Sequence, residues 1–88
     1  MEAPDDAAVE RVLEWYEKDP GDALVGDEVL TGLALADLRE VLSVPDDDPD
    51  MLDVYEVEPA EVDRLQPFVT HRIDLDAHDY FVAAYRAR

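Results

Sequence analysis

Five aspartates crowd into residues 46–53, and closely spaced carboxylates supply the oxygen ligands that Ca²⁺ prefers. An EF-hand loop that began at Asp46 would have suitable carboxylates at Asp48 and Asp50. Such a loop also requires glycine at its sixth position and glutamate at its twelfth, where this chain has Met51 and Val57. We therefore predict a solvated acidic loop without a metal site. Its carboxylates are those of Asp46, Asp47, Asp48, Asp50 and Asp53.

The two histidines, His71 and His78, are the other candidate metal ligands, because three aspartates lie near them in the sequence. These are Asp74, Asp76 and Asp79. The distance between the histidines is not a recognised ligand spacing. We expect surface or turn histidines, with no bound metal or cofactor.

The sequence contains no recognisable catalytic nucleophile. The single serine, Ser43, precedes Val44-Pro45 and lacks the glycines of a nucleophile elbow. There is no cysteine, and the three glycines form no phosphate-binding motif. Carboxylate pairs do not indicate catalysis here, because 24 acidic residues in 88 must place some pairs close together by chance. We predict that the protein is not an enzyme.

The formal net charge of −17 constrains the partners of the chain. Nucleic acids and anionic membranes are bound by basic surfaces, so neither is expected as a partner. No apolar run approaches the ~20 residues that cross a bilayer, and the acidic first residues lack a signal-peptide pattern. We expect a cytoplasmic protein that binds a basic partner, binds a metal or works at high salt.

The same charge predicts a response to salt. Carboxylates repel one another in the folded state, and salt screens exposed charges that are more than ~10 Å apart at about 0.1 M. The melting temperature, measured by scanning calorimetry, is therefore expected to rise with NaCl concentration. A melting temperature that stays constant from low to molar salt would contradict this expectation.

The first thirty residues are predicted to form a β-hairpin. Residues 7–19 fit either a helix with one apolar face or a strand, since residues 12–16 are rich in strand formers. The sequence Asp19-Pro20-Gly21-Asp22 then provides a turn, and residues 23–30 form a second short, partly β-branched run. Two such runs joined by a Pro-Gly turn favour the hairpin. Residues 1–6 are expected to be a frayed lead-in.

Helices are predicted in the middle of the chain. Leucines at helical spacing indicate a helix that opens at Thr31-Gly32 and ends at Pro45. Residues 54–57 alternate as a short strand does. Pro59 suits the first position of a second helix, which Pro67 shortens or kinks.

Residues 76–88 are the second ambiguous segment, after a brief extended piece at residues 73–75. Alternation over residues 80–85 favours a strand, whereas Asp76 with Asp79 resembles a helix start, and we predict a strand. The result is one α+β domain, residues 1–88, of order ββαβαβ, with two helices on one face of an antiparallel or mixed sheet. The predicted core comprises Trp15, Tyr16, Val25, Leu35, Leu38, Leu42, Val54, Val57, Leu65, Phe68, Leu75, Phe81 and Val82.

Three stretches of the chain resemble a known family. Residues 15–26 (WYEKDPGDALVG) resemble a hairpin of the kind "YDK-x-T-G-x-LVG", and residues 47–55 (DDPDMLDVY) resemble "DDP-M-x-DVY". Residues 73–76 together with 79–82 resemble "IDL-x-x-YDYFV". The chain departs from these patterns at its Asp-Pro-Gly-Asp turn and at an additional aspartate, Asp50. The resemblance is to a family of small acidic bacterial domains of unknown function, and it implies the hairpin and the last strand but no activity.

The leading hypothesis is a non-enzymatic module that binds a basic protein, by class analogy an immunity or antitoxin-type inhibitor. Trp15 and Tyr16 would face opposite sides of a strand, and an exposed aromatic ring among carboxylates anchors a basic partner well. The predicted partner-binding residues are Asp46, Asp47, Asp48, Asp50, Asp53, Asp74, Asp76, Asp79 and Trp15. The alternative is that acidity serves solubility in high salt, with a homodimer as the functional form. A carboxylate metal-binding domain is the third hypothesis.

Overall fold

The computed structural model describes residues 9–18, 21 and 23–86. The predicted lead-in of residues 1–6 lies outside the described residues, as do three of the four residues of the predicted Asp19–Asp22 turn. The fourth is Gly21, whose amide donates a hydrogen bond to the Lys18 carbonyl at 2.9 Å. That bond is the one expected of a tight turn between two strands.

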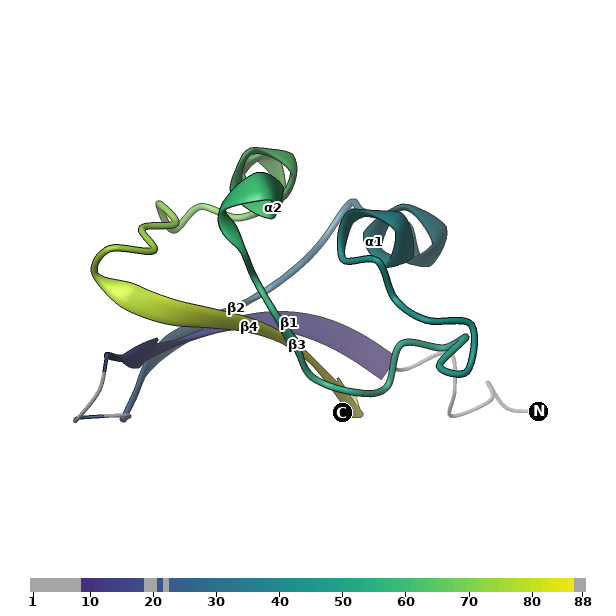
Figure 1. The fold of residues 1–88 in the computed structure, drawn as a ribbon, viewed down its shortest axis with the longest axis horizontal. Helices are drawn as coiled ribbons and strands as arrows, with labels where there is room; N and C mark the ends of the chain where they lie inside the picture. Colours follow the sequence, from purple (N-terminus) through teal and green to yellow (C-terminus); the bar gives the residue numbers. More distant parts are fainter. Residues whose placement is uncertain (1–8, 19–20, 22, 87–88) are drawn as a thin grey trace.

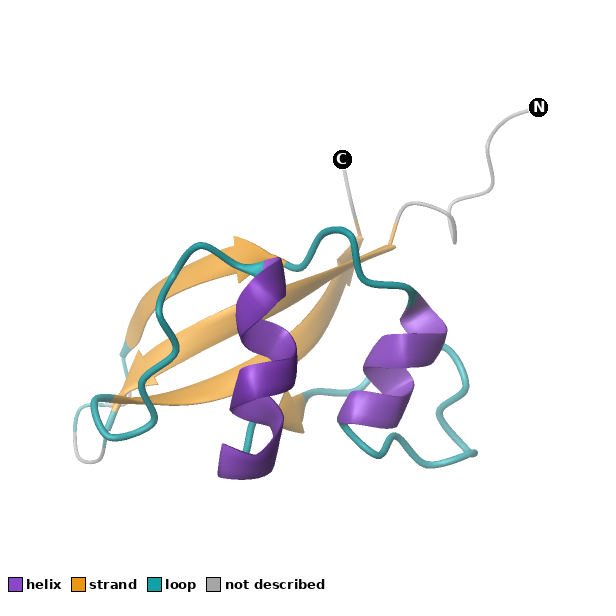
Figure 2. Ribbon diagram, turned by 90° about the horizontal axis from the view of Figure 1, so that it is seen from above, coloured by secondary structure: helices purple, strands orange, loops and turns teal. Residues whose placement is uncertain are grey.

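Within the part of the chain that the structure describes, four antiparallel strands form one sheet (Figure 1), in the order β2-β1-β4-β3. The strands are β1 (Val9–Glu17), β2 (Leu24–Val29), β3 (Tyr55–Glu56) and β4 (His78–Arg86). Helices α1 (Leu35–Val41) and α2 (Pro59–Leu65) lie on the same face of the sheet, as Figures 1 and 2 show. The predicted α+β class and the order ββαβαβ are confirmed, and the ambiguous segments contain strands, β1 and β4, rather than helices over their described residues.

The hairpin of β1 and β2 is built around Trp15. Trp15 pairs with Gly26, and the register then shifts through a bulge so that Tyr16 pairs with Leu24. A Cβ atom on Gly26 would lie 2.6 Å from the indole ring, so a larger residue there would force β2 away from β1. The glycine makes room for the indole on the helix-covered face of the sheet.

Prolines shape the second helix. Pro59 is its first residue, where a missing N–H is not needed, and the Glu61 carboxylate accepts a hydrogen bond from the Glu58 amide at 2.8 Å. The α-helix then gives way to a 3₁₀ turn, η2 (Gln66–Phe68), that contains Pro67, as predicted. Among the described residues, no helix is both long and apolar enough to cross a membrane.

The core lies between the sheet and the two helices. Leu13, Tyr80 and Val82 of the strands are fully buried and pack in one cluster with Leu38 and Leu65 of the helices. The predicted core residues that are buried in this cluster are Trp15, Leu38, Leu42, Val57, Leu65 and Val82. The cluster also contains residues that the sequence pattern did not single out, namely Leu13, Leu30, Val41, Met51, Ile73 and Tyr80.

Four residues predicted for the core lie outside it. Val25 and Val54 are 50% and 60% exposed, while Tyr16 and Phe81 are half-buried on the face of the sheet without helices. The reason is that β1 and β4 carry apolar residues on both faces, so hydrophobicity alone does not say which face is covered. The extended piece at residues 73–75 pairs with none of the four described strands and leads into the turn before β4.

Candidate functional site

The face of the sheet opposite the helices is covered by none of the described elements (Figure 1). Alternation along paired strands places one set of side chains there. The set is Glu10, Val12, Glu14 and Tyr16 of β1, Leu24, Asp27 and Val29 of β2, Glu56 of β3, and Asp79, Phe81, Ala83 and Tyr85 of β4. We call these residues the open face. Leu24, Val29 and Tyr85 are 51%, 37% and 49% exposed, so large apolar side chains meet solvent on it.

Glu14 lies on the open face between Asp27 of β2 and Phe81 of β4, yet it is only 6% exposed. The Tyr16 hydroxyl donates to Glu14 Oε1 at 3.0 Å, and the Tyr85 hydroxyl donates to Oε2. The hydrogen bond to Glu14 raises the pKa of Tyr85 to about 12. Burial, and then the same carboxylate, raises the pKa of Tyr16. Both phenols therefore stay protonated at neutral pH and hold the carboxylate in one orientation.

A shallow groove of about 410 Å³ opens beside this carboxylate. Its lining consists of Glu14, Tyr16, Val54, Asp79, Phe81 and Tyr85. Tyr16 and Phe81 meet edge to face, with ring centroids 5.7 Å apart. Val54 comes from the segment before β3. Aromatic and aliphatic walls around a carboxylate suit a cation that has an apolar stem.

Carboxylates outnumber cations around the groove. The open face carries Glu10, Glu14, Asp27, Glu56 and Asp79. Lys18 provides a positive charge near these carboxylates, and its Nζ lies 3.0 Å from Asp79 Oδ1 in an exposed ion pair. The described part of this face is therefore acidic as well as apolar.

Asp48 organises the acidic loop from within. Its carboxylate accepts hydrogen bonds from the Tyr55 hydroxyl and from the amides of Leu52 at 2.9 Å and Asp53 at 3.1 Å. The bond from the Tyr55 hydroxyl, followed by that from the Leu52 amide, lowers the pKa of Asp48. The same carboxylate raises the pKa of Tyr55 to about 12. The Asp48 carboxylate therefore already has hydrogen-bond partners within the loop.

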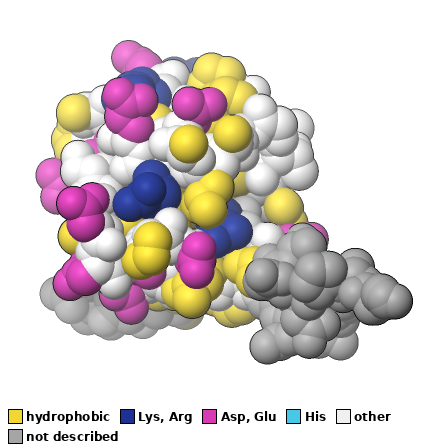
Figure 3. Space-filling view, turned by 90° about the vertical axis from the view of Figure 1, so that its right-hand side faces the viewer, with side chains coloured by type: hydrophobic (Ala, Val, Ile, Leu, Met, Phe, Trp, Pro, Cys, Tyr) yellow, Lys and Arg dark blue, Asp and Glu magenta, His cyan; other side chains and the backbone are white. Residues whose placement is uncertain are grey.

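The rest of the acidic loop lies among basic side chains. Arg11 donates a hydrogen bond to the backbone carbonyl of Asp50, and Arg39 contributes to the lowered pKa of Asp48. Figure 3, which views the α1 end of the molecule, shows dark blue and magenta side chains interleaved there. Asp46, Asp47, Asp50 and Asp53 are exposed. Nearby arginines weaken the negative potential of the loop.

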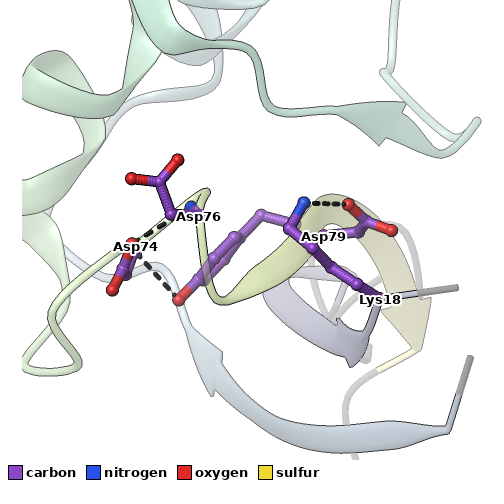
Figure 4. Close-up of polar contacts among 5 residues, drawn as sticks. Lys18, Asp74, Asp76 and Asp79 are labelled. Atoms are coloured by element: carbon purple, nitrogen blue, oxygen red, sulfur yellow. Dashed lines mark hydrogen bonds and ion pairs between the residues drawn. The ribbon is translucent and has the colours of Figure 1, made fainter. Parts of the chain in front are cut away.

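The second predicted acidic group lies in and after the turn that leads into β4, at the opposite end of the long axis from the loop (Figure 1). Asp74 Oδ1 accepts from the Asp76 amide at 3.0 Å, and the Asp74 amide donates to the Tyr80 hydroxyl at 3.0 Å (Figure 4). Asp79 forms the pair with Lys18. The two predicted groups are therefore not brought together, and only Asp79 belongs to the open face.

The histidines and their aspartate neighbours form no metal site in the described part of the chain. His71 Nε2 lies 2.6 Å from the Tyr80 hydroxyl, so this ring nitrogen already has a partner. No cluster of three or more acidic or histidine side chains within the described ranges is arranged to hold a metal ion. The metal-binding hypothesis gains no support from this geometry.

Residues 10–83 match the model of a family described as Domain of unknown function (DUF7683). The chain belongs to this family. The match runs from β1 into β4, so it includes both helices and most of the sheet. It covers Glu14, Tyr16 and Phe81 and ends two residues before Tyr85. A search of curated proteins finds no match.

Trp15 is a core residue of this DUF7683 domain. It is 8% exposed and stacks on His71, with ring centroids 3.7 Å apart and planes 10° from parallel. The Tyr80 hydroxyl accepts a hydrogen bond from the Asp74 amide at 3.0 Å and lies 2.6 Å from His71 Nε2. The predicted contact of Trp15 with a partner stays a prediction, although its ring lies in the core. Of the two successive aromatic residues, Tyr16 is the one on the open face.

Glu28 fixes the segment after η2 against β2. Its carboxylate accepts from the amides of Thr70 at 2.8 Å and His71 at 3.0 Å, and also from the Thr70 hydroxyl. These bonds, led by that from the Thr70 amide, lower the pKa of Glu28. Glu28 therefore holds His71 over the indole.

The position of His71 predicts a pH dependence of stability. Burial lowers the pKa of His71 below its usual 6.5, with His78 as a second cause and Glu28 opposing them. The unfolded chain then binds the proton more readily than the folded one. The contribution of neutral His71 to the free energy of unfolding is therefore complete above about pH 6.5, and it is lost as the pH falls below that value. Urea unfolding at pH 7.5 and 5.5, followed by the fluorescence of the single tryptophan, measures the loss.

His71→Phe provides the control for this prediction, since phenylalanine keeps a ring against Trp15 but does not titrate. The difference in unfolding free energy between the two pH values is expected to shrink in this variant. An unchanged difference would assign the pH dependence to the carboxylates instead.

Of the residues that line the groove, Asp79 was a predicted site residue, whereas Glu14, Tyr16, Val54, Phe81 and Tyr85 were not. A signal was present in β1, where apolar residues occupy successive positions 12 and 13 and again 15 and 16. A strand with apolar residues on both faces requires a cover for each. Within the described residues, the helices cover one face of β1, and no helix or strand covers the other.

Proposed function

We propose that this chain is a non-enzymatic, cytoplasmic module that binds a cationic protein through its open face. The observation that carries the proposal is the combination of exposed apolar side chains and carboxylates on a sheet face that no described element covers. Burial of Leu24, Val29, Val54 and Tyr85 would supply affinity, while the surrounding carboxylates would select a basic surface. An inhibitor of the immunity type, which covers the basic substrate-binding surface of a bacterial toxin, is the form of this function that we favour.

Charge argues against a second copy as the occupant of the open face. Face-to-face pairing of two copies would oppose two acidic rims, and like charges across an interface are unfavourable by several kcal/mol. The net charge of −17 on each copy adds long-range repulsion. A cationic partner turns the same charges into attraction, which also speeds association at low salt.

A matched pair of variants tests the proposal in an affinity pull-down from the source lysate. Val54→Lys places a positive charge at the groove, and Ala60→Lys places the same charge on the exposed surface of α2, on the other side of the sheet. We expect one basic protein to be retained at low salt by the wild type and by Ala60→Lys but not by Val54→Lys. Its retention should weaken at about 0.5 M NaCl.

Two results would contradict the proposal. Equal retention by all three proteins would remove the open face from the interface. No basic partner, together with dimerisation that Val54→Lys abolishes, would favour self-association in a salty cytoplasm.

A further inference from the structure

The carboxylate of Glu14 has no opposite charge beside it in the described part of the chain. It is 6% exposed, and its two hydrogen bonds come from neutral tyrosine hydroxyls. A nearly buried carboxylate without a counter-charge is unfavourable, because hydrogen bonds replace only part of the lost hydration. The open face therefore holds a charge that a partner's cation would stabilise.

The remaining acceptor capacity of Glu14 fits a forked donor. A carboxylate offers about four lone-pair sites, and the tyrosines use one on each oxygen. One site per oxygen is left, and two parallel N–H bonds from a guanidinium match that arrangement. A lysine ammonium is a compact point charge that holds its water more strongly, so it gains less from this site.

The walls of the groove suit the rest of an arginine side chain. Tyr16, Phe81 and Tyr85 provide ring faces and edges within the same groove as the carboxylate, and Val54 provides aliphatic surface. Guanidinium groups stack on aromatic rings, and the arginine stem buries apolar area. A volume of about 410 Å³ is large enough for one such side chain with neighbouring atoms.

We propose that the groove on the open face is an arginine-recognition site, in which Glu14, oriented by Tyr16 and Tyr85, pairs with a guanidinium group of the partner protein. The inference rests on the proposed function and names the chemistry of its central contact. Tyr16 and Tyr85 act as positioning residues, since each holds one oxygen of the carboxylate.

Short peptides test the site without knowledge of the partner. The probes are N-acetyl-Gly-Leu-Arg-Leu-Gly-amide and the same peptide with lysine in place of arginine. Titrated into ¹⁵N-labelled protein, the arginine peptide is expected to shift the amide signals of Glu14, Tyr16 and Phe81 and to bind about tenfold more tightly than the lysine peptide. A factor of ten corresponds to about 1.4 kcal/mol.

Two variants separate the role of Glu14 from acidity in general. Glu14→Gln keeps the size of the side chain and an acceptor for one tyrosine, and it is expected to weaken binding of the arginine peptide at least tenfold. Asp27→Asn removes a charge from the paired position on β2 and is expected to weaken it less than threefold. The amide spectrum of each free variant verifies that it is folded.

Three results would overturn this inference. They are equal binding of the two peptides, equal effects of Glu14→Gln and Asp27→Asn, and no shifts at the groove with the arginine peptide at ~10 mM. The proposed function would survive all three results if the wild type, but not Val54→Lys, still retained a basic protein in the pull-down. Shifts that depend on protein concentration in the absence of peptide would identify a second copy as the occupant, and both proposals would then fail.

Discussion

Tyr80→Ala is expected to lower the free energy of unfolding by about 3–5 kcal/mol, which is the range for removal of a large buried aromatic side chain. Tyr80 is fully buried, and its hydroxyl links the Asp74 amide to the His71 ring. Removal of the ring leaves a cavity beside Trp15 and Val82, and removal of the hydroxyl leaves the Asp74 amide and His71 Nε2 without this partner. A small domain has only about 5–15 kcal/mol in total, so much of its stability is lost. Urea unfolding followed by tryptophan fluorescence measures the change.

Tyr85→Ala is the matched control, because it removes the same side chain from the same strand on the opposite face. Tyr85 is 49% exposed, so its removal leaves no buried cavity, and the loss of its bond to Glu14 is expected to lower the free energy of unfolding by only about 1–2 kcal/mol. Equal destabilisation by the two substitutions would contradict the assignment of β4 side chains to a covered face and an open face.

The effect of Tyr85→Ala on partner binding is expected to be large. Exposed aromatic residues at the centre of an interface commonly contribute at least about 2 kcal/mol, which corresponds to a loss of affinity of roughly thirtyfold. Tyr85 also orients the Glu14 carboxylate, so its loss disturbs the charged contact as well. Isothermal titration calorimetry with the basic protein retained in the pull-down measures the affinity.

Leu52→Ala is the control for binding, since Leu52 is 58% exposed but lies in the acidic loop and does not line the groove. Its affinity for the partner is expected to stay within about threefold of the wild type, because peripheral contacts contribute little. A larger loss with Leu52→Ala than with Tyr85→Ala would move the interface to the acidic loop.

Two kinds of acidic surface have separate roles in this account. Exposed aspartates of the loop, such as Asp46 and Asp47, extend the negative field and would speed the approach of a cationic protein without fixing its position. Glu14 is buried and held by two hydroxyls, so it would act only on a side chain that enters the groove. Substitution of the exposed loop aspartates should slow association with the partner, and substitution of Glu14 should speed dissociation from it.

Local chemistry explains why the order of elements could be predicted. The Pro-Gly turn decided in favour of a hairpin for the first segment, and Pro59 and Pro67 bounded the second helix. The covered face could not be predicted in the same way. Tyr80 and Phe81 are adjacent and similar in hydrophobicity, and only the position of the helices decides that Tyr80 is buried and Phe81 is not.

The candidate site was missed because it is assembled from distant segments. Aspartates 46–53 are dense in the sequence, so they dominated the predicted site, although Asp48 serves the fold and arginines lie near the loop. The groove instead combines side chains of β1 and β4 with Val54, which precedes β3. Its carboxylates lie on different strands. Strand register, which the sequence does not reveal, brings them together.

Site-specific photo-crosslinking determines whether the partner protein sits on the open face. A photoreactive amino acid is placed at Val54 in the groove or, for comparison, at Ala60 on α2, and cells of the source are irradiated. We expect a crosslink from position 54 to one basic protein, through or next to an arginine, and none to that protein from position 60. A crosslink to the same protein from position 60 alone, or a crosslink from position 54 only to a second copy of the chain, would contradict this expectation.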